Sequence, residues 1–294
     1  MRLRRSTILV PSNIDRMVEK AREFAADVVL LDLEDAVPAV DDEKEHARAN
    51  MIAALGGGGF SAREISIRVN GPRTKWFEAD VLAAVQAGAA SITLPHTYGA
   101  EDVVRAEAAI AAAAQDAVPE ILLAVETPAT LLDLEDIARR TRHITALYVA
   151  PIDFTLAIGS TALLLGGGAI GASDQLFWLR HKLLTVARAH GWNAVDAPVV
   201  NDPRDPASVR SAMEASRALG FDGTGVLYPG HVAIANEVFS PSTEELAWAD
   251  EIIGRFDKLR DGRAADASGG KLVMVQHYEF AKDLRALAAR IEER

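Results

Sequence analysis

Cysteine is absent from this chain, and its absence removes several kinds of chemistry at once. None of the 294 residues is Cys, so disulfide bonds, thiolate metal sites and cysteine nucleophiles are excluded. Basic residues are also in deficit, because 31 Lys and Arg stand against 42 Asp and Glu, giving a formal net charge of −11. Nucleic-acid surfaces need clustered Lys and Arg to neutralise phosphates, so we expect no nucleic-acid partner.

Long hydrophobic runs are lacking too. The basic start at residues 1–5 is followed by a short apolar stretch, residues 8–11, that ends in proline and cannot form the core of a signal peptide. No segment approaches the ~20 consecutive apolar residues of a membrane-spanning helix. We therefore expect a cytoplasmic protein with no membrane partner.

What the chain does have is 49% hydrophobic residues arranged in a repeating order. Short apolar runs alternate with longer amphipathic, alanine-rich runs, which is typical of repeated βα units. The runs predict eight strands at residues 7–11, 28–33, 65–69, 91–95, 121–125, 146–149, 194–199 and 225–228. Helices are expected at residues 13–26, 42–55, 74–87, 100–114, 128–141, 173–190 and 205–219. We predict the α/β class and a (β/α)8 barrel over residues 1–240, with an open doubly wound sheet as the alternative.

The end of the chain departs from this order. Ser242 followed by Glu245 forms a capping-box pattern, which predicts a helix from there to about residue 259. A linker at 261–270 and a final amphipathic segment at 271–293 complete a helical extension, 241–294, that would pack on its own barrel or on a neighbouring subunit.

Two glycine-rich stretches have different predicted roles. Residues 56–59 connect a helix to a strand, whereas phosphate-binding loops lead from a strand into a helix, so this stretch is a simple connection. Residues 166–168 lie in a helix-poor stretch, 158–172, after the sixth strand, where we expect a mobile lid over the active face.

Charged side chains stand at or just beyond the ends of three apolar runs. Arg68 lies at the end of the run at 65–69, Glu126 follows the run at 121–125, and Asp153 follows the run at 146–149. Because the carboxyl ends of parallel barrel strands open onto one face, these side chains are expected to converge there. Two carboxylates leave coordination positions for water and substrate oxygens, which is how proteins usually hold Mg²⁺. We therefore predict Mg²⁺ on Glu126 and Asp153, although either acid alone could instead cap the following helix.

Arg68 is expected to bind a substrate carboxylate through its planar guanidinium, or else to form a structural ion pair with Asp32 or Glu34. Asn70, two residues further along, is expected to face the same way, closer to the rim. The same alternation of side chains places Asp32 and Glu34 on one side of the second strand and Asp35 on the other. We expect these acids to support the metal site rather than to bind the ion.

Three further residues are candidates for the pocket. His96 follows the fourth strand and is either a general base or an ordinary polar contact, while Tyr228 and His231 follow the last strand and would line the pocket. The chain contains no nucleophile elbow with a serine triad, no Walker A sequence and no complete dinucleotide-binding fingerprint.

These segments together resemble the HpcH/HpaI aldolase and citrate lyase β-subunit family. The similarity covers residue 4 to about residue 275, and its landmarks stand in the family's order. They are residues 4–13, residues 31–38, Lys44 with Ala47 and Arg48, residues 68–70, Glu126 with Thr127, Asp153, and residues 236–242.

The resemblance implies a TIM barrel that binds Mg²⁺ on Glu126 and Asp153. It further implies a substrate site formed by Arg68, Glu126, Asn70 and Pro151, and a homotrimer or hexamer with a C-terminal segment exchanged between subunits. Family members break or form a carbon–carbon bond next to a carbonyl, on malate-type CoA thioesters or on 2-oxo acids.

The chain also departs from the family at positions that move protons. Where the CoA-dependent branch has Gly-Lys-Met-Val/Ile-Asp, this chain has Met274 in place of the final Asp. The family's Pro-Lys after the fourth strand is Pro95-His96, and the aldolase branch's histidine has no counterpart after Asp35. The groups that remain for proton transfer are Glu34, Asp35, His96, Tyr228 or a metal-bound water. The residues predicted to be catalytic are Glu34 and Asp35 from this set, together with Arg68.

We expect a Mg²⁺-dependent carbon–carbon lyase or aldolase that acts on a 2-oxo or β-hydroxy acid, either free or as a CoA thioester of the malyl-CoA or citramalyl-CoA type. The alternatives are a thioesterase or condensing enzyme of the same family, or a non-catalytic protein that binds a metal and an oxoacid.

Overall fold

The computed structural model describes residues 2–115, 117–160, 176–200, 202–257 and 272–293, together with the backbone of 265–266. The chain forms two compact units, Met1–Asn236 and Glu237–Arg294. The first unit carries the strands of a barrel, and the second is a helical unit with its own small core.

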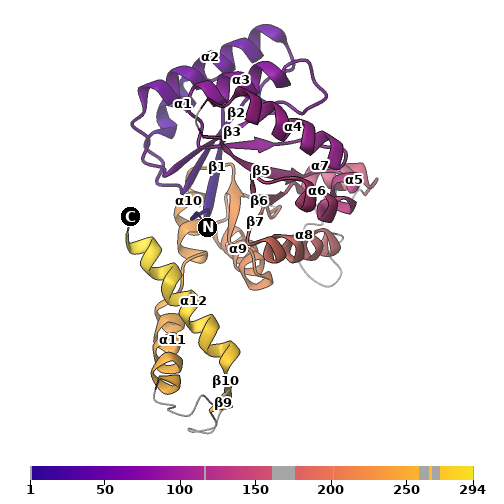
Figure 1. Ribbon diagram of the computed structural model, residues 1–294. Helices are drawn as coiled ribbons and strands as arrows, with labels where there is room; N and C mark the ends of the chain where they lie inside the picture. The colour runs from indigo at the N-terminus through magenta and orange to yellow at the C-terminus, as the bar shows by residue number, and fades with distance from the viewer. Residues whose placement is uncertain are drawn as a thin grey trace. The chain divides into compact units, whose positions relative to one another are not determined.

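Eight parallel strands close into a barrel in sequence order, with β1 paired to both β2 and β8 (Figure 1). The strands are β1 (Ser6–Pro11), β2 (Val28–Asp32), β3 (Glu64–Arg68), β4 (Ser91–Leu94), β5 (Glu120–Val125), β6 (Ile144–Val149), β7 (Asn193–Asp196) and β8 (Gly223–Val226). Several are buried on both faces, as in β2 and β5, which explains why they are almost continuously apolar in sequence. The predicted TIM barrel is confirmed.

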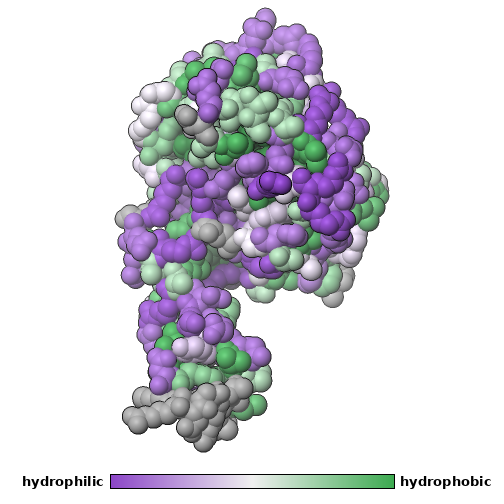
Figure 2. Space-filling model, viewed as in Figure 1, coloured by the Kyte–Doolittle hydropathy of each residue, from purple (hydrophilic) through white to green (hydrophobic). Residues whose placement is uncertain are grey.

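Helices follow the strands and cover the outside of the ring (Figure 1). They are α1 (Asp15–Ala21), α2 (Asp41–Gly57), α3 (Phe77–Gln86), α4 (Ala100–Ala113), α5 (Pro128–Leu132), α6 (Leu134–Arg140), α7 (Pro151–Ala157), α8 (Phe177–His190), α9 (Pro206–Leu219) and α10 (His231–Val238). On the face drawn in Figure 2, hydrophilic residues cover much of the barrel unit's surface between smaller hydrophobic areas.

The helices expected at 13–26 and 128–141 differ from the structure, and α7 was not expected. The first of them is shorter than predicted, because α1 spans only Asp15–Ala21. The single helix expected at 128–141 is interrupted at Asp133, whose carboxylate accepts a hydrogen bond from the backbone N–H of Ala100 at 3.1 Å. Directly after β6 the chain forms the short helix α7, so Asp153 lies in the first turn of a helix rather than at a strand end. Pro151 stands at the start of α7, a position where its fixed φ favours a helix. The lid expected at 158–172 falls mostly outside the described residues.

The end of the barrel where the strands begin is closed by a buried ionic network. The Arg4 side chain is fully buried, and its guanidinium donates to Glu64 at 2.9 and 3.0 Å and also to Glu120. Thr145 and Asn193 accept further hydrogen bonds from the same guanidinium. The network links β3, β5, β6 and β7 to the segment before β1. Because it fills this end of the barrel, a pocket can open only at the opposite end, where the strands finish.

The second unit consists mainly of α11 (Thr243–Phe256) and α12 (Val275–Glu292), with the short strands β9 (Ala265–Asp266) and β10 (Val273–Met274). Ser242 caps α11, and the Glu245 carboxylate accepts a 2.7 Å hydrogen bond from the backbone N–H of Ser242, as the capping-box pattern predicts. The two helices share a core that includes Ala249, Ile252, Ala281 and Leu284. Among the described residues, no helix combines the length and the apolar character needed to cross a lipid bilayer.

Candidate active site

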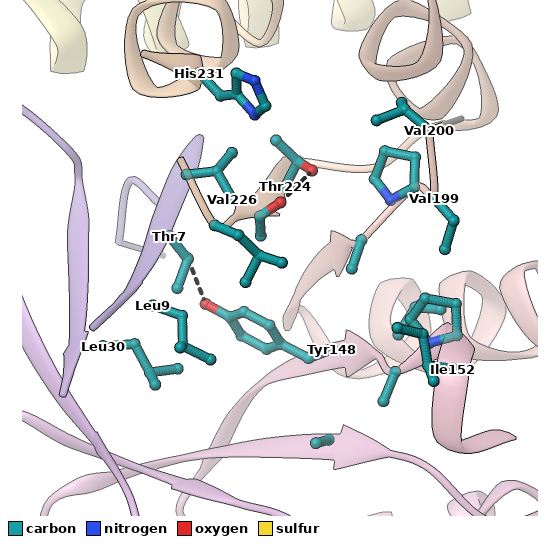
Figure 3. Close-up of a pocket in the computed structure, with 18 of the residues that line it drawn as sticks. Thr7, Leu9, Leu30, Tyr148, Ile152, Val199, Val200, Thr224, Val226 and His231 are labelled. Carbon is teal, nitrogen blue, oxygen red and sulfur yellow. Dashed lines mark hydrogen bonds between the residues drawn. The ribbon is translucent and has the colours of Figure 1, made fainter. Parts of the chain in front are cut away.

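A pocket of about 410 Å³ opens inside the barrel at the carboxyl ends of the strands. All eight strands, or the residues that directly follow them, contribute to its wall, so the closure of the barrel itself creates the pocket (Figure 3). Its acidic and guanidinium side chains are Arg68, Glu126 and Asp153. The structure therefore brings together the three side chains that the sequence singled out.

Arg68, the last residue of β3, is held by two acids from the end of β2. Its Nε and Nη2 donate to the two carboxylate oxygens of Asp32, each at 2.6 Å, and its Nη1 lies 3.2 Å from Glu34 Oε2. The structural ion pair considered from the sequence is thus present. A guanidinium has five N–H groups in a planar fork, so the edge formed by Nη1 and Nη2 keeps donors for a further anion.

Glu126 follows β5 directly and is 2% exposed. Burial raises the pKa of its carboxyl to about 7, and the neighbouring charge of Asp153 acts in the same direction, while contact with His96 opposes it. Asp153 lies within electrostatic reach and lines the same pocket. Two acids that repel each other across a pocket are a suitable pair for a divalent cation, because the cation removes the repulsion.

His96 joins two carboxylates behind the pocket. Its Nε2 lies 2.8 Å from Glu34 Oε1 and its Nδ1 lies 3.1 Å from Glu126 Oε2. The backbone N–H of His96 donates to the same Glu126 oxygen at 2.6 Å. Contacts with Asp35 and Glu34 raise the pKa of the His96 imidazole to about 11, so it is a cation at neutral pH. His96 therefore forms charged contacts with Glu34 and Glu126, and its role in catalysis stays a prediction.

The backbone at His96 is unusual, since its φ of 47° is the one positive value among the described residues other than glycine. This conformation is rare for a residue with a Cβ and is often found at functional sites. Gly71 packs against it so closely that a Cβ built on Gly71 would lie 2.8 Å from the Cβ of His96. Sequence reasoning missed this arrangement, although a glycine three residues after Arg68 was a signal for close packing.

The expected separation of Glu34 from Asp35 is wrong. Strand β2 ends at Asp32, so the alternation of side chains stops before these residues, and both acids reach the same imidazole. Asp35 Oδ1 lies 3.8 Å from His96 Nε2, and this contact helps to lower the pKa of Asp35 well below its usual range. Ligand atoms of Glu34, Asp35 and His96 lie within 4.8 Å of one another, but His96 is itself a cation at neutral pH, so this trio is an ion-paired cluster rather than a second cation site.

The remaining candidates have different surroundings. Asn70 is buried, and its amide nitrogen donates to Leu33 O at 2.9 Å and to Asp80 at 2.6 Å. This group therefore links the segment after β2 to α3, and its substrate role stays a prediction. Pro151, Tyr228 and His231 all line the pocket, as expected for Tyr228 and His231 from their positions after the last strand.

Among the described residues, the ionisable groups in the pocket wall and directly beside it include more acids than cations. Five acids, Asp32, Glu34, Asp35, Glu126 and Asp153, lie in the pocket wall or beside it, together with three cations, Arg68, His96 and Lys44. When all of these groups are ionised, two negative charges remain. A divalent cation would neutralise them, which agrees with the oxygen-rich set of donors around Glu126 and Asp153.

A closed parallel barrel with acids and a guanidinium at the carboxyl ends of its strands has the form of a TIM-barrel enzyme. The chain belongs to the HpcH/HpaI aldolase/citrate lyase family, whose model matches residues 5–229.

Proteins similar to this chain in sequence or structure include members that support this family assignment. The chain is 34% identical over 296 residues to a (3S)-malyl-CoA thioesterase of Cereibacter sphaeroides, covering 98% of this chain and 95% of that protein. It is 31% identical over 290 residues to an L-malyl-CoA/beta-methylmalyl-CoA lyase of Rhodobacter capsulatus, covering 92% and 90%. A crystal structure of CitE from Mycobacterium tuberculosis in complex with magnesium, acetoacetate and coenzyme A has the same fold, with a TM-score of 0.76, 23% identity and 97% coverage of both chains.

Proposed function

We propose that this protein is a Mg²⁺-dependent carbon–carbon lyase that acts on a 2-oxo or 3-hydroxy acid, carried as a CoA thioester of the malyl-CoA type. The observation that carries the proposal is the convergence of Glu126, Asp153 and Arg68 on one pocket of the barrel. The named relatives act on malyl-CoA, and the CitE structure contains magnesium and coenzyme A, which supports both the cofactor and the substrate class.

Glu126 and Asp153 would hold the magnesium ion. When bound, magnesium supplies a Lewis acid that polarises a carbonyl or hydroxyl oxygen of the substrate. Arg68 would hold the substrate carboxylate through donors of Nη1 and Nη2 that remain available, while Asp32 fixes the Nε–Nη2 edge and Glu34 lies beside Nη1. The side chains thus orient the acid end of the substrate before the bond breaks.

Proton transfer would fall to the group formed by Glu34, Asp35 and His96. Cleavage of a 3-hydroxy acyl thioester removes the hydroxyl proton, forms a carbonyl, and leaves the bonding electrons on the thioester fragment as an enolate, which then takes up a proton. Burial raises the pKa of Glu34, which favours it as an acceptor near neutral pH, and His96 at 2.8 Å holds it in place.

Hydrolysis of the thioester is the second candidate, because one of the named relatives is a thioesterase. It would use the same metal and guanidinium but would need a water positioned at the thioester carbonyl. The two reactions give different products, since the lyase leaves an acyl-CoA and a carbonyl compound, whereas the thioesterase releases free CoA and an acid.

Turnover of malyl-CoA, citramalyl-CoA and 4-hydroxy-2-oxo acids, with and without Mg²⁺, tests the proposal. A thiol-reactive dye reports free CoA without background, because the chain has no cysteine, and a carbonyl reagent reports the lyase product. We expect Mg²⁺-dependent carbonyl formation without thiol release. Thiol release alone would favour the thioesterase, and ligand binding without any product would favour a non-catalytic binding protein.

The variant Asp153→Ala tests the assignment of the metal ligands. It should lose both Mg²⁺ affinity, measured by calorimetry, and turnover, whereas the exposed change Glu251→Gln in α11 should retain both. Normal Mg²⁺ binding and activity in Asp153→Ala would contradict the proposed site.

A further inference from the structure

The pocket has two chemically different sides. The ionic groups lie on β3, after β5 and on α7, and most of the remaining wall is apolar. We call this part the apolar chamber and define it by Leu30, Tyr148, Val199, Val200, Met213 and Val226. Figure 3 shows the labelled members around one space, with the ring of Tyr148 beside Leu9 and Leu30.

Several polar side chains on this side of the pocket, those of Thr7, Tyr148, Thr224 and His231, already have partners within the protein. The hydroxyl groups of Thr7 and Tyr148 lie 2.8 Å apart and bond to each other (Figure 3). Thr224 donates to Gly225 O at 3.2 Å, and His231 Nε2 lies 2.8 Å from Pro203 O. A second carboxylate or hydroxyl placed in the chamber would give up its water without gaining an equivalent hydrogen bond.

We propose that the substrate carries an apolar substituent, a branched alkyl or aromatic group larger than one methyl, and that the apolar chamber binds it. The inference rests on the proposed function, because Arg68 and the metal site must hold the acid end for the substituent to reach the chamber. At about 410 Å³ the pocket lies within the range of small-molecule sites, which gives room for such a group beside the acid.

The affinity of 2-oxo acids for the Mg²⁺-loaded protein tests this inference without requiring turnover. Calorimetry would compare pyruvate, 2-oxobutyrate, 2-oxopentanoate, 4-methyl-2-oxopentanoate and phenylpyruvate. Burial of one methylene is worth ~0.8 kcal/mol, so we expect the Kd to fall about fourfold with each added carbon until the chamber is full.

Variants within the chamber sharpen the test. Val199 and Val200 are partly exposed loop residues, so Val199→Phe and Val200→Phe should fill the chamber without disturbing the fold and should lower the ratio of phenylpyruvate to pyruvate affinity about tenfold. Val226→Thr, which adds a hydroxyl at constant shape, should lower the ratio several-fold. Val40→Phe, an exposed change outside the pocket, should leave the ratio as it is.

The outcomes separate the two proposals. If pyruvate binds only with Mg²⁺ but longer chains bind no more tightly, the apolar-substituent inference is overturned and the proposed function stands. Loss of affinity with each added carbon would also overturn the inference. If no 2-oxo acid binds with Mg²⁺, the metal–oxoacid site and the inference both fall.

Discussion

At the scale of single residues, the close packing of Gly71 on His96 fixes the position of a side chain that contacts Glu126, one of the proposed metal ligands. A Cβ on Gly71 would lie 2.8 Å from the His96 Cβ, closer than real Cβ atoms approach, and it would also meet the backbone oxygens of Pro95 and His96 at 3.6 Å. We expect Gly71→Ala to shift His96 and to weaken Mg²⁺ binding about tenfold, because partners of a metal ligand typically control affinity to this extent.

The matched control for this change is Gly56→Ala. Gly56 lies in α2 with nothing within 4 Å of an added Cβ, and alanine is the better helix former by ~1 kcal/mol. Calorimetry of Mg²⁺ binding should give the wild-type value for Gly56→Ala. Equal Mg²⁺ affinities in the two variants would argue against a role for the His96 position.

The raised pKa of Glu126 predicts how Mg²⁺ affinity depends on pH. Because burial raises its pKa to about 7, its carboxyl carries a proton below that pH, and a cation must displace this proton to bind. Mg²⁺ affinity should therefore be constant above about pH 8 and should fall by up to tenfold for each pH unit below 7. Calorimetry between pH 5.5 and pH 8.5 measures the slope, and a flat profile would show that Glu126 is not a ligand.

The buried contacts of Arg4 predict how its replacement changes the free energy of unfolding. Arg4→Met would leave the buried carboxylate of Glu64 and the half-buried carboxylate of Glu120 without their common partner, a kind of loss that costs about 3–5 kcal/mol. The neighbouring exposed pair of Arg2 with Glu120 should matter far less, so Arg2→Met should cost less than about 1 kcal/mol. Urea unfolding of the two variants checks the contrast, and similar losses would contradict it.

At the scale of elements, the barrel was predictable because each strand is a short apolar run with a distinct helix after it. Buried parallel strands show this pattern whatever their neighbours are. The short helix α7 was missed because it follows β6 with no polar linker. Helices α5 and α6 were merged because the break between them lies at Asp133, whose carboxylate accepts a hydrogen bond from the distant backbone N–H of Ala100.

The sequence also predicted part of the candidate site, namely the positions of its charged side chains, but not the local arrangement around them. Positions after the strands located Arg68, Glu126 and Asp153, since topology alone brings such positions to one face. The role of His96 depends on a positive φ and on packing against Gly71, and the place of Asp35 depends on where β2 ends. Neither the backbone conformation nor the strand end could be read from residue types.

The capping box of α11 gives a prediction at this scale. Ser242→Ala removes the side chain that accepts from the backbone N–H of Glu245 and should destabilise the second unit by about 1 kcal/mol. Thermal unfolding followed by the fluorescence of Trp248, which packs against the core of this unit, would report the change. Thr243→Ala, one residue later, is the control, and an equal effect of both changes would rule out the cap.

At the scale of the whole molecule, we propose that the protein assembles as a homotrimer or hexamer. Large apolar side chains remain exposed in the single chain, among them Leu132, Trp178 and Phe280, each more than half exposed. Such surface is commonly covered by other subunits. Light scattering coupled to gel filtration should give a mass of three or six chains at micromolar concentration, and a monomer mass would contradict the proposal.

The closed ring of strands limits how copies of this protein can associate. Each strand of the barrel is hydrogen-bonded on both sides, so the barrel offers no free rim of amide groups on which another polypeptide could add a strand. Association through the barrel must therefore use side chains, which distinguish one partner from another, and the native barrel gives amyloid-like growth no template.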